Sequence, residues 1–407
     1  YAAGDHIGIG WGSVSGLMGG VPVQADTAGR YESGRYFGWG IAHEIGHQIN
    51  QSAYAHAEVT NNYFSVLAQA KDSNDSVRFR YPEVFKKVTS GTTGYANNVF
   101  TQLGMYWQLH LAYDRGYNYK TYGTWQEIQK NLFFARVDRY AREPAAAPAP
   151  KGIRLEISGD RDQNLMRLAS AAAEHDLTEF FTRWGMVPDG KTRSYMGQFA
   201  EEERAVCYVD DAARVYEMTH ADDSAGAGRA MIRAVAAKAD STGSVDVTIT
   251  STESEGRIQG YEIVRIFTEG GKERRELAGF TQGRTWTDDA AFAANHTITY
   301  EVRAVDKWLH YSAPVQALPV KAGGSGILDK TGWSVTTNMV SAEDVVPDSN
   351  EDLPCENTKE SAVIKVINGD LADRYTGTAT EADPYILLQL NRQEEVSSMS
   401  YICDGGT

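Results

Sequence analysis

Three features that assign proteins to common classes are missing or scarce in this sequence. Its 407 residues contain no run of about 18 apolar residues, the length that a membrane-spanning helix needs. Positive charge is in deficit, because 39 lysines and arginines stand against 54 aspartates and glutamates, for a formal net charge of −15. This balance argues against nucleic acid or an anionic membrane surface as the main partner.

Cysteine is the third scarce feature, with three residues in the whole chain. Cys207, Cys355 and Cys403 lie far apart and show none of the paired spacings of a cysteine-based zinc site. Cys355 and Cys403 fall in one C-terminal segment and can pair with each other. Cys207 is then left over, and we expect it to be buried as a small apolar side chain.

The chain also lacks an initiating methionine and a signal peptide, since it opens at Tyr1 directly on a strand-like segment. It ends at Gly405-Gly406-Thr407 without an obvious terminal element. We therefore expect an internal piece of a longer protein, and the missing signal peptide says nothing about secretion. Hydrophobic residues (42%) and aromatic residues (11%) indicate a globular chain, long enough for about two to four domains.

What the sequence does contain is an H-E-x-x-H motif, His43-Glu44-Ile45-Gly46-His47, within a predicted helix over residues 34–51. On a helix the two histidines are one turn apart and share a face, so they can hold one zinc ion. Glu44 lies about 100° round the helix, where it can take a proton from a metal-bound water. The motif therefore predicts a catalytic zinc site with Glu44 as general base.

A third, anionic ligand is available in Glu58, which follows His47 by eleven residues. It leaves the fourth position of the metal open for water, as a catalytic zinc site requires. Two simpler interpretations are that the histidines are incidental on an amphipathic helix and that Glu58 is a solvated surface carboxylate. Gly38, Gly40 and Gly46 favour the metal site, because each costs about 1 kcal/mol relative to alanine in a helix and suits close packing.

A second helix is predicted over residues 56–70 from the apolar spacing of Val59, Tyr63 and Val66. On such a helix Glu58 and Asn62 are four residues apart and lie on one face. Asn62 can therefore orient the Glu58 carboxylate or a nearby backbone group in support of the metal ligands. The alternative is a plain surface asparagine.

The rest of residues 1–222 is predicted to be mainly helical. Residues 4–14 are predicted to form a Gly-rich strand, either an ordinary edge strand or one that binds substrate by strand addition. Further helices are expected over residues 95–117 and 124–140, and residues 161–185 are expected to form one helix or a helix pair. An Ala/Pro-rich loop is expected over residues 143–151. We therefore predict one helical metallopeptidase domain over residues 1–222.

The pattern changes to β-structure beyond Gly226. Alternating apolar residues predict strands over residues 245–250, 260–267, 285–288 and 297–305. These strands indicate an antiparallel β-sandwich over residues 228–320, and residues 327–407 contain further strand-like stretches. The predicted fold class is a multidomain α+β chain, with a mainly helical peptidase domain followed by β-sandwich modules.

The metal motif and the stretch Glu58-Val59-Thr60-Asn61-Asn62 together resemble the enhancin family of zinc peptidases. These are thermolysin-like gluzincins that include viral enhancins and the mucin-degrading peptidases of gut bacteria. The resemblance implies His43, His47 and Glu58 as zinc ligands and Glu44 as general base. It also implies an O-glycopeptidase, whose substrates are mucin-type glycoproteins cleaved next to O-glycosylated serine or threonine.

The two C-terminal segments resemble modules that commonly hold such enzymes on glycans. Residues 260–263 and 300–306 are similar to a fibronectin type III module. Residues 327–407 resemble the first half of a discoidin-type, galactose-binding-like domain, in which a loop such as Asn368-Gly369-Asp370 binds a structural calcium. Asn368 stands here in place of the usual aspartate. The resemblance implies glycan binding by this module and an extracellular location, secreted or attached to the cell surface.

Several residue roles and two further functions stay open. Core packing and oxyanion stabilisation are both open to Tyr106, His110, Tyr140 and His175. Trp39 and Trp184 can each be a platform for a sugar or an ordinary buried tryptophan. The alternative functions are a gluzincin that cuts unglycosylated protein and a glycan-binding adhesin with a vestigial peptidase domain.

Overall fold

The protein forms two compact units in the computed structural model. The first comprises residues 1–238, 246–287 and 297–320, and the second comprises residues 239–245, 288–296 and 321–407. The structure describes residues 2–3, 6–7, 42–71, 80–96, 98–114, 132–222, 228–239, 244–289, 297–321, 333–340, 378–379, 383 and 385–389.

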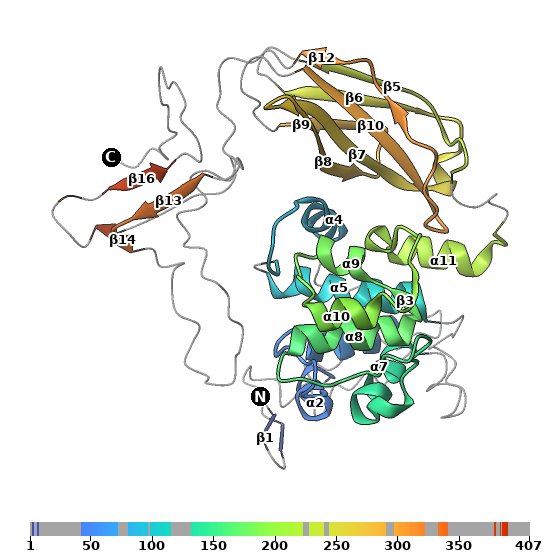
Figure 1. Cartoon of the computed structure of the whole chain (residues 1–407), viewed down its shortest axis with the longest axis vertical. Helices are drawn as coiled ribbons and strands as arrows, with labels where there is room; N and C mark the ends of the chain where they lie inside the picture. The colour runs from blue at the N-terminus through green and yellow to red at the C-terminus, as the bar shows by residue number, and fades with distance from the viewer. Residues whose placement is uncertain are drawn as a thin grey trace, which may run out of the picture. The chain divides into compact units, whose positions relative to one another are not determined.

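Helices dominate the N-terminal part of the first unit (Figure 1). They are α2 (Ala42–Ile49), α3 (Thr60–Lys71), α4 (Tyr81–Thr89), α5 (Val99–Tyr113), α7 (Phe133–Arg142), α8 (Arg161–Ala173), α9 (Thr178–Arg183), α10 (Gly190–Met196) and α11 (Asp211–Thr219), with 3-10 turns η3 (Pro144–Ala146) and η4 (Val206–Tyr208). The short strands here are β1 (Ala2–Ala3) paired with β2 (His6–Ile7), and β3 (His175–Asp176) paired with β4 (Ala200–Glu201).

Helix α5 forms the centre of this helical part. Its residues 101–113 are all buried and largely apolar, as expected for a helix surrounded by others. Helices α3, α4, α7 and α11 contact it. Helix α4 can approach closely because Gly104 has no Cβ, which would otherwise meet the side chain of Val84. Asn98 caps the helix, since its side chain accepts a hydrogen bond from the backbone amide of Phe100. The core built on α5 thus supports α3, the helix that follows Glu58.

Left-handed residues decide where two predicted helical segments begin or divide. The helix predicted over residues 56–70 begins only at Thr60, because Glu58 has a φ of 62° and residues 57–59 form a turn. Residues 161–185, predicted to form one helix or a helix pair, form the pair α8 and α9. Glu174, with a φ of 60°, ends α8 before strand β3 begins. The correction at Glu58 arises from a backbone conformation that apolar periodicity does not report.

The other predicted elements are confirmed over part of their length. Helix α2 covers residues 42–49 of the helix predicted over 34–51, α5 lies within 95–117, and α7 overlaps 124–140, while residues 8–41 and 115–131 lie outside the described residues. Helices α4, α10 and α11 were not predicted. In the described part of the chain, no helix has both the length and the apolar character needed to cross a membrane.

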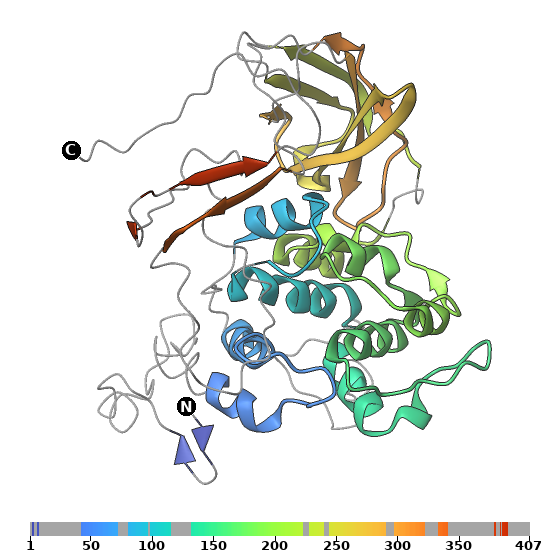
Figure 2. The ribbon, with the colours of Figure 1, turned by 60° about the vertical axis from the view of Figure 1, so that its left-hand side comes forward.

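The sandwich predicted over residues 228–320 consists of two sheets, visible as two layers in Figures 1 and 2. One sheet has the order β11-β10-β7-β8, with β12 also paired to β10, and the other has the order β5-β6-β9. The strands are β5 (Ile232–Ala239), β6 (Val245–Ser251), β7 (Ile258–Glu269), β8 (Lys272–Thr281), β9 (Thr285–Asp288), β10 (Thr297–Asp306), β11 (Val315–Gln316) and β12 (Val320–Lys321). Buried Val302 of β10 stands opposite buried Ile263 of antiparallel β7. The predicted strands are therefore confirmed.

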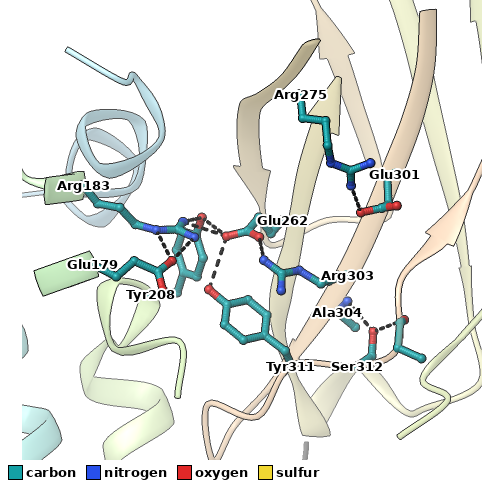
Figure 3. A network of polar contacts seen from close by, with 11 residues as sticks. Glu179, Arg183, Tyr208, Glu262, Arg275, Glu301, Arg303, Ala304, Tyr311 and Ser312 are labelled. Carbon is teal, nitrogen blue, oxygen red and sulfur yellow. Dashed lines mark hydrogen bonds and ion pairs between the residues drawn. The ribbon is translucent and has the colours of Figure 1, made fainter. Parts of the chain in front are cut away.

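Within the first unit, strand β7 packs on the helices through the buried carboxylate of Glu262 (Figure 3). One oxygen lies 2.7 Å from Arg183 of α9, and the other lies 2.5 Å from Arg303 of β10. The hydroxyl of Tyr208 donates a hydrogen bond to Glu262 over 2.8 Å. Burial favours a raised pKa for such a carboxyl, but the two guanidinium groups prevail and hold the pKa of Glu262 below its usual range. The helices and most of the sandwich thus belong to one compact unit, whereas residues 239–245 and 288–296 belong to the second.

In the second unit, the described strands form two short antiparallel pairs. Strand β13 (Ser334–Thr337) pairs with β16 (Ile386–Gln389), and β14 (Met339–Val340) pairs with β15 (Thr378–Ala379). These pairs include parts of two strand-like stretches predicted for residues 327–407. The proposed calcium loop, Asn368-Gly369-Asp370, and both Cys355 and Cys403 lie outside the described residues.

Candidate metal centre

Helix α2 presents His43 and His47, one turn apart, on the face that meets α3. The two imidazole rings are nearly perpendicular, with centroids 4.9 Å apart and an interplanar angle of 87°. Their side chains are 16% and 28% exposed, so both are shielded but reachable. Glu44 lies in the first turn of α2 beside His43 and is also partly buried. The helix therefore brings together the two predicted ligands and the predicted base.

Glu58 reaches the two histidines from the turn before α3. One carboxylate oxygen lies 3.2 Å from Nε2 of His43, and the other lies 3.3 Å from Nε2 of His47. Ligand atoms of the three residues all lie within 4.8 Å of one another. The left-handed backbone of Glu58 puts its side chain at the start of α3, toward α2, rather than on the helical face predicted from the sequence. The structure thus brings the predicted ligands together, but through a turn at Glu58 and not through a continuous helix.

The close approach of α2 and α3 depends on Gly46, inside the metal motif. A Cβ at this position would lie 2.7 Å from both Cα and Cβ of Asn61, which real Cβ atoms do not tolerate. The interpretation of Gly46 as a residue for close packing agrees with this contact. Because Gly46 precedes His47 directly, its contact with Asn61 sets how near α3 comes to the histidines.

Asn62 holds the ring of His43 from α3. Its side-chain oxygen lies 2.7 Å from Nδ1 of His43, and its amide nitrogen donates to the backbone carbonyl of Glu58. The oxygen can only accept, so Nδ1 carries the proton and Nε2 keeps its lone pair for a metal. Sequence reasoning placed Asn62 beside Glu58 but missed its contact with His43, which only the packing of two helices reveals.

The electrostatics of the cluster favour an anionic Glu58. Contact with the imidazoles of His43 and His47 holds the pKa of Glu58 well below its usual range, although burial opposes this. Burial acts to lower the pKa of His43, but its contacts with the Glu58 carboxylate and the Asn62 oxygen prevail and raise it. The site therefore offers a carboxylate that stays charged, as a cation ligand must.

The loop that carries Glu58 is anchored by helices far away in the sequence. Tyr54 donates to Asp138 of α7 over 2.6 Å, and His56 lies 2.9 Å from Asp162 of α8. The side-chain amide of Asn164, also on α8, donates to the carbonyl of residue 53 over 2.7 Å. These contacts hold the loop between α2 and α3 just before Glu58, so the position of Glu58 depends on α7 and α8.

The donor set fits a zinc ion. Two imidazole nitrogens and one carboxylate oxygen are the ligands that catalytic zinc sites use, with a further position left for water. Asn61 also lies beside the cluster, with its amide nitrogen 3.1 and 2.9 Å from Nε2 of His43 and His47 and its buried side-chain oxygen without a hydrogen-bond partner among the described residues, which marks an unmet polar group at the site. In the part of the chain that the structure describes, no other group of three or more such residues is close enough to hold a metal.

Other candidate residues lie in the core or outside the described part. Tyr106 is buried in α5, and His110 stacks on Trp107 and lies 2.9 Å from the hydroxyl of Tyr63. Trp184 is fully buried, which agrees with a structural tryptophan. The remaining candidates are half-buried Tyr140 on α7, half-buried His175 in β3, and Trp39, which lies outside the described residues. Cys207 is buried with a free thiol, as predicted.

Comparisons with solved structures find similar chains at low sequence identity. The ZmpB metallopeptidase from Clostridium perfringens shows 22% identity and a TM-score of 0.46, over 69% of this chain and 49% of that one. The M60 catalytic domain of ZmpC from the same organism, solved in complex with the sialyl T antigen, shows 21% identity and a TM-score of 0.45, over 69% and 50%. A functionally unknown conserved protein from Bacillus anthracis shows 17% identity and a TM-score of 0.32, over 70% and 55%. This chain thus spans about half the length of each.

A search of curated proteins finds no match to the sequence. A family model does match, and the matched segment includes all four residues of the predicted site, His43, Glu44, His47 and Glu58. The β-sandwich and the second unit lie outside it, so their resemblance to fibronectin type III and discoidin modules stays a prediction. Residues 2–185 match the family of Peptidase M60, enhancin and enhancin-like.

Proposed function

We propose that this protein is a zinc metalloendopeptidase that hydrolyses peptide bonds in mucin-type O-glycosylated proteins outside the cell. The observation that carries the hydrolase assignment is the convergence of His43, His47 and Glu58 within 4.8 Å, beside Glu44. The match of residues 2–185 to the M60 peptidase family supports the same reaction class. Nitrogen and carboxylate donors with one position left over are what peptide hydrolysis at zinc needs.

Each residue of the cluster has a separate role in the proposed hydrolysis. A zinc ion held there supplies Lewis-acid chemistry, polarising the scissile carbonyl and making water acidic enough to react near neutral pH. Glu44 accepts the proton of the attacking water and returns it to the leaving amine. Asn62 keeps Nε2 of His43 directed at the ion, and Glu58 supplies the negative charge that helps retain it.

The glycoprotein part of the proposal rests on sequence. The Glu58–Asn62 stretch resembles enhancins, whose bacterial relatives degrade mucins, and the C-terminal β-segments resemble modules that bind glycans. Substrates of this kind are found outside cells, which is why we propose a secreted or surface-attached enzyme. In this proposal the peptidase part cuts the polypeptide while the C-terminal part keeps the enzyme on its glycosylated substrate.

The decisive experiment is incubation with a defined panel of O-glycopeptides and the same peptides without glycan, followed by mass spectrometry. We expect cleavage beside the glycosylated residue and little cleavage of the bare peptides. Glu44→Ala should retain one equivalent of zinc and lose at least about 100-fold in rate, because it removes the base and no ligand. Glu156→Ala, at an exposed position in the same unit, serves as the matched control.

Each other outcome selects a different function. Equal cleavage of glycosylated and bare peptides would identify a peptidase of ordinary protein. A protein that binds glycan but neither zinc nor scissile peptide would be an adhesin. Undiminished cleavage by Glu44→Ala would refute the role of Glu44 as general base, whatever the substrate.

A further inference from the structure

Asn61 lies inside the histidine cluster although no role was assigned to it from the sequence. Its side-chain amide nitrogen lies 3.1 Å from Nε2 of His43 and 2.9 Å from Nε2 of His47. The residue is fully buried, so its carboxamide does not contact solvent. We propose that Asn61 is a further protein group of the metal centre, which adds a carboxamide oxygen to the three ligands and still leaves a position for water, because catalytic zinc sites can accommodate five groups. This inference rests on the proposed zinc site.

The first argument is distance. Ligand atoms about 2.0–2.1 Å from one tetrahedral zinc ion lie about 3.3 Å from one another. The Glu58 oxygens lie 3.2 and 3.3 Å from the two Nε2 atoms, and the terminal atom of Asn61 lies at nearly the same distances, 3.1 and 2.9 Å. Asn61 and Glu58 therefore have equivalent positions relative to the two imidazoles. Both groups thus face the pair of nitrogen atoms that would hold the ion.

The second argument is hydrogen-bond satisfaction. With the nitrogen toward the histidines, Asn61 uses the lone pairs that a metal needs, and its oxygen is buried without a partner in the described structure. The two ends of a carboxamide have nearly the same shape, so they exchange by a half-turn of the terminal group. After that exchange the oxygen faces the cluster, where a cation satisfies it. The amide nitrogen of Asn61 then no longer occupies the imidazole lone pairs that a metal needs.

The third argument is that the backbone is built to bring Asn61 here. The absence of a Cβ at Gly46 is what lets Cα and Cβ of Asn61 approach α2 between the two histidines. A neutral oxygen donor also leaves the charge of the site unchanged, with one carboxylate for a divalent ion. The resulting centre keeps a net positive charge, which suits polarisation of a carbonyl.

The test measures metal binding rather than turnover. Zinc affinity is determined by competition with a chromophoric chelator for the full chain, Asn61→Leu, Asn61→Asp and the control Ser65→Ala, a buried position on α3 one turn further along. We expect Asn61→Leu to bind zinc at least about 10-fold more weakly than the parent. Asn61→Asp, which keeps an oxygen at the same place, should bind zinc at least as tightly as the parent, and Ser65→Ala should bind it equally.

The visible absorption of the cobalt-substituted proteins is the second readout. Because these bands depend on the groups around the ion, Asn61→Leu should change them while Ser65→Ala should not. Asn61→Leu with parental affinity and spectrum would overturn the inference, and so would Asn61→Asp binding zinc more weakly than Asn61→Leu. If the leucine variant fails to fold, the near-isosteric Asn61→Asp decides alone, and weaker zinc binding than that of the parent would then overturn the inference. A parent chain that binds no zinc would instead refute the proposed function.

Discussion

At the scale of single residues, His43 shows how a ligand needs a partner to present the right nitrogen. The spacing of the H-E-x-x-H motif predicts that His43 and His47 share a helix face, but either nitrogen of an imidazole can face a metal. The hydrogen bond from Nδ1 of His43 to Asn62 leaves Nε2 for the ion. The functional property of His43 therefore depends on a residue of another helix.

Asp114, which directly follows α5, is a second residue whose chemistry depends on its surroundings. Its carboxylate is 3% exposed, and one oxygen lies 3.3 Å from Nδ1 of His110. Burial raises the pKa of Asp114 to about 7, although the Phe133 amide and the guanidinium groups of Arg214 and Arg136 oppose the shift. Burial, helped by Arg214, also lowers the pKa of His110 to about 3.

The raised pKa of Asp114 predicts a pH-dependent stability. An unfolded aspartate has a pKa of about 3.9, so Asp114 contributes stability at low pH that is lost as the pH rises through about 7. His110 acts in the opposite sense, but it is present in both proteins of a comparison with Asp114→Asn. We expect this variant to gain stability relative to the parent between pH 4 and 7, by up to about 1.4 kcal/mol per pH unit. Urea denaturation at several pH values measures this, and a constant difference across the range would contradict it.

At the scale of elements, the contact between α2 and α3 predicts the effect of a single methyl group. Gly46→Ala places a Cβ against the backbone of Asn61, so α3 must move away from the histidines. We expect a loss of stability of about 1–3 kcal/mol, as for overpacked cores, together with weaker zinc binding. Thermal unfolding and chelator competition measure the two effects.

Gly190→Ala is the matched control for this change. Gly190 begins α10, and a Cβ there would meet no atom within 4 Å. Alanine is the better helix former, so this variant should be unchanged or slightly more stable, with normal zinc binding. Equal behaviour of the two variants would show that the contact of α2 with α3 does not limit the site.

At the scale of the whole molecule, Glu262 predicts how strongly the sandwich depends on the helices within the first unit. Glu262→Gln leaves the guanidinium groups of Arg183 and Arg303 without their buried counter-charge. Removing one partner of a buried ion pair costs about 3–5 kcal/mol, so the unfolding midpoint in urea should fall markedly. Glu276→Gln, which removes a half-exposed carboxylate 3.6 Å from Arg265, should cost less than about 1 kcal/mol. Similar losses for both variants would contradict a special role for the buried pair.

The sequence predicted the molecule best where local periodicity carries the information. The strands of the sandwich and much of α2, α5 and α7 follow from apolar spacing, because side-chain direction repeats regularly along a helix or strand. It failed at Glu58, whose left-handed backbone delays the start of α3 without any change in hydrophobicity. At Glu174 it left one helix and a helix pair open, and the left-handed backbone there decided for the pair. The charged contact of Glu262 with Arg183 joins residues 79 positions apart and has no local signature.

For the metal centre, the sequence by itself determined the spacing of His43 and His47 and the presence of a base and an acid nearby. The helical repeat alone accounts for that spacing. Tertiary structure decided the rest: the turn that directs Glu58, the packing of Gly46 on Asn61, and the hydrogen bond that orients His43. The physical reason is that a metal site needs atoms placed within a few tenths of an ångström, and only helices packed against each other supply that precision.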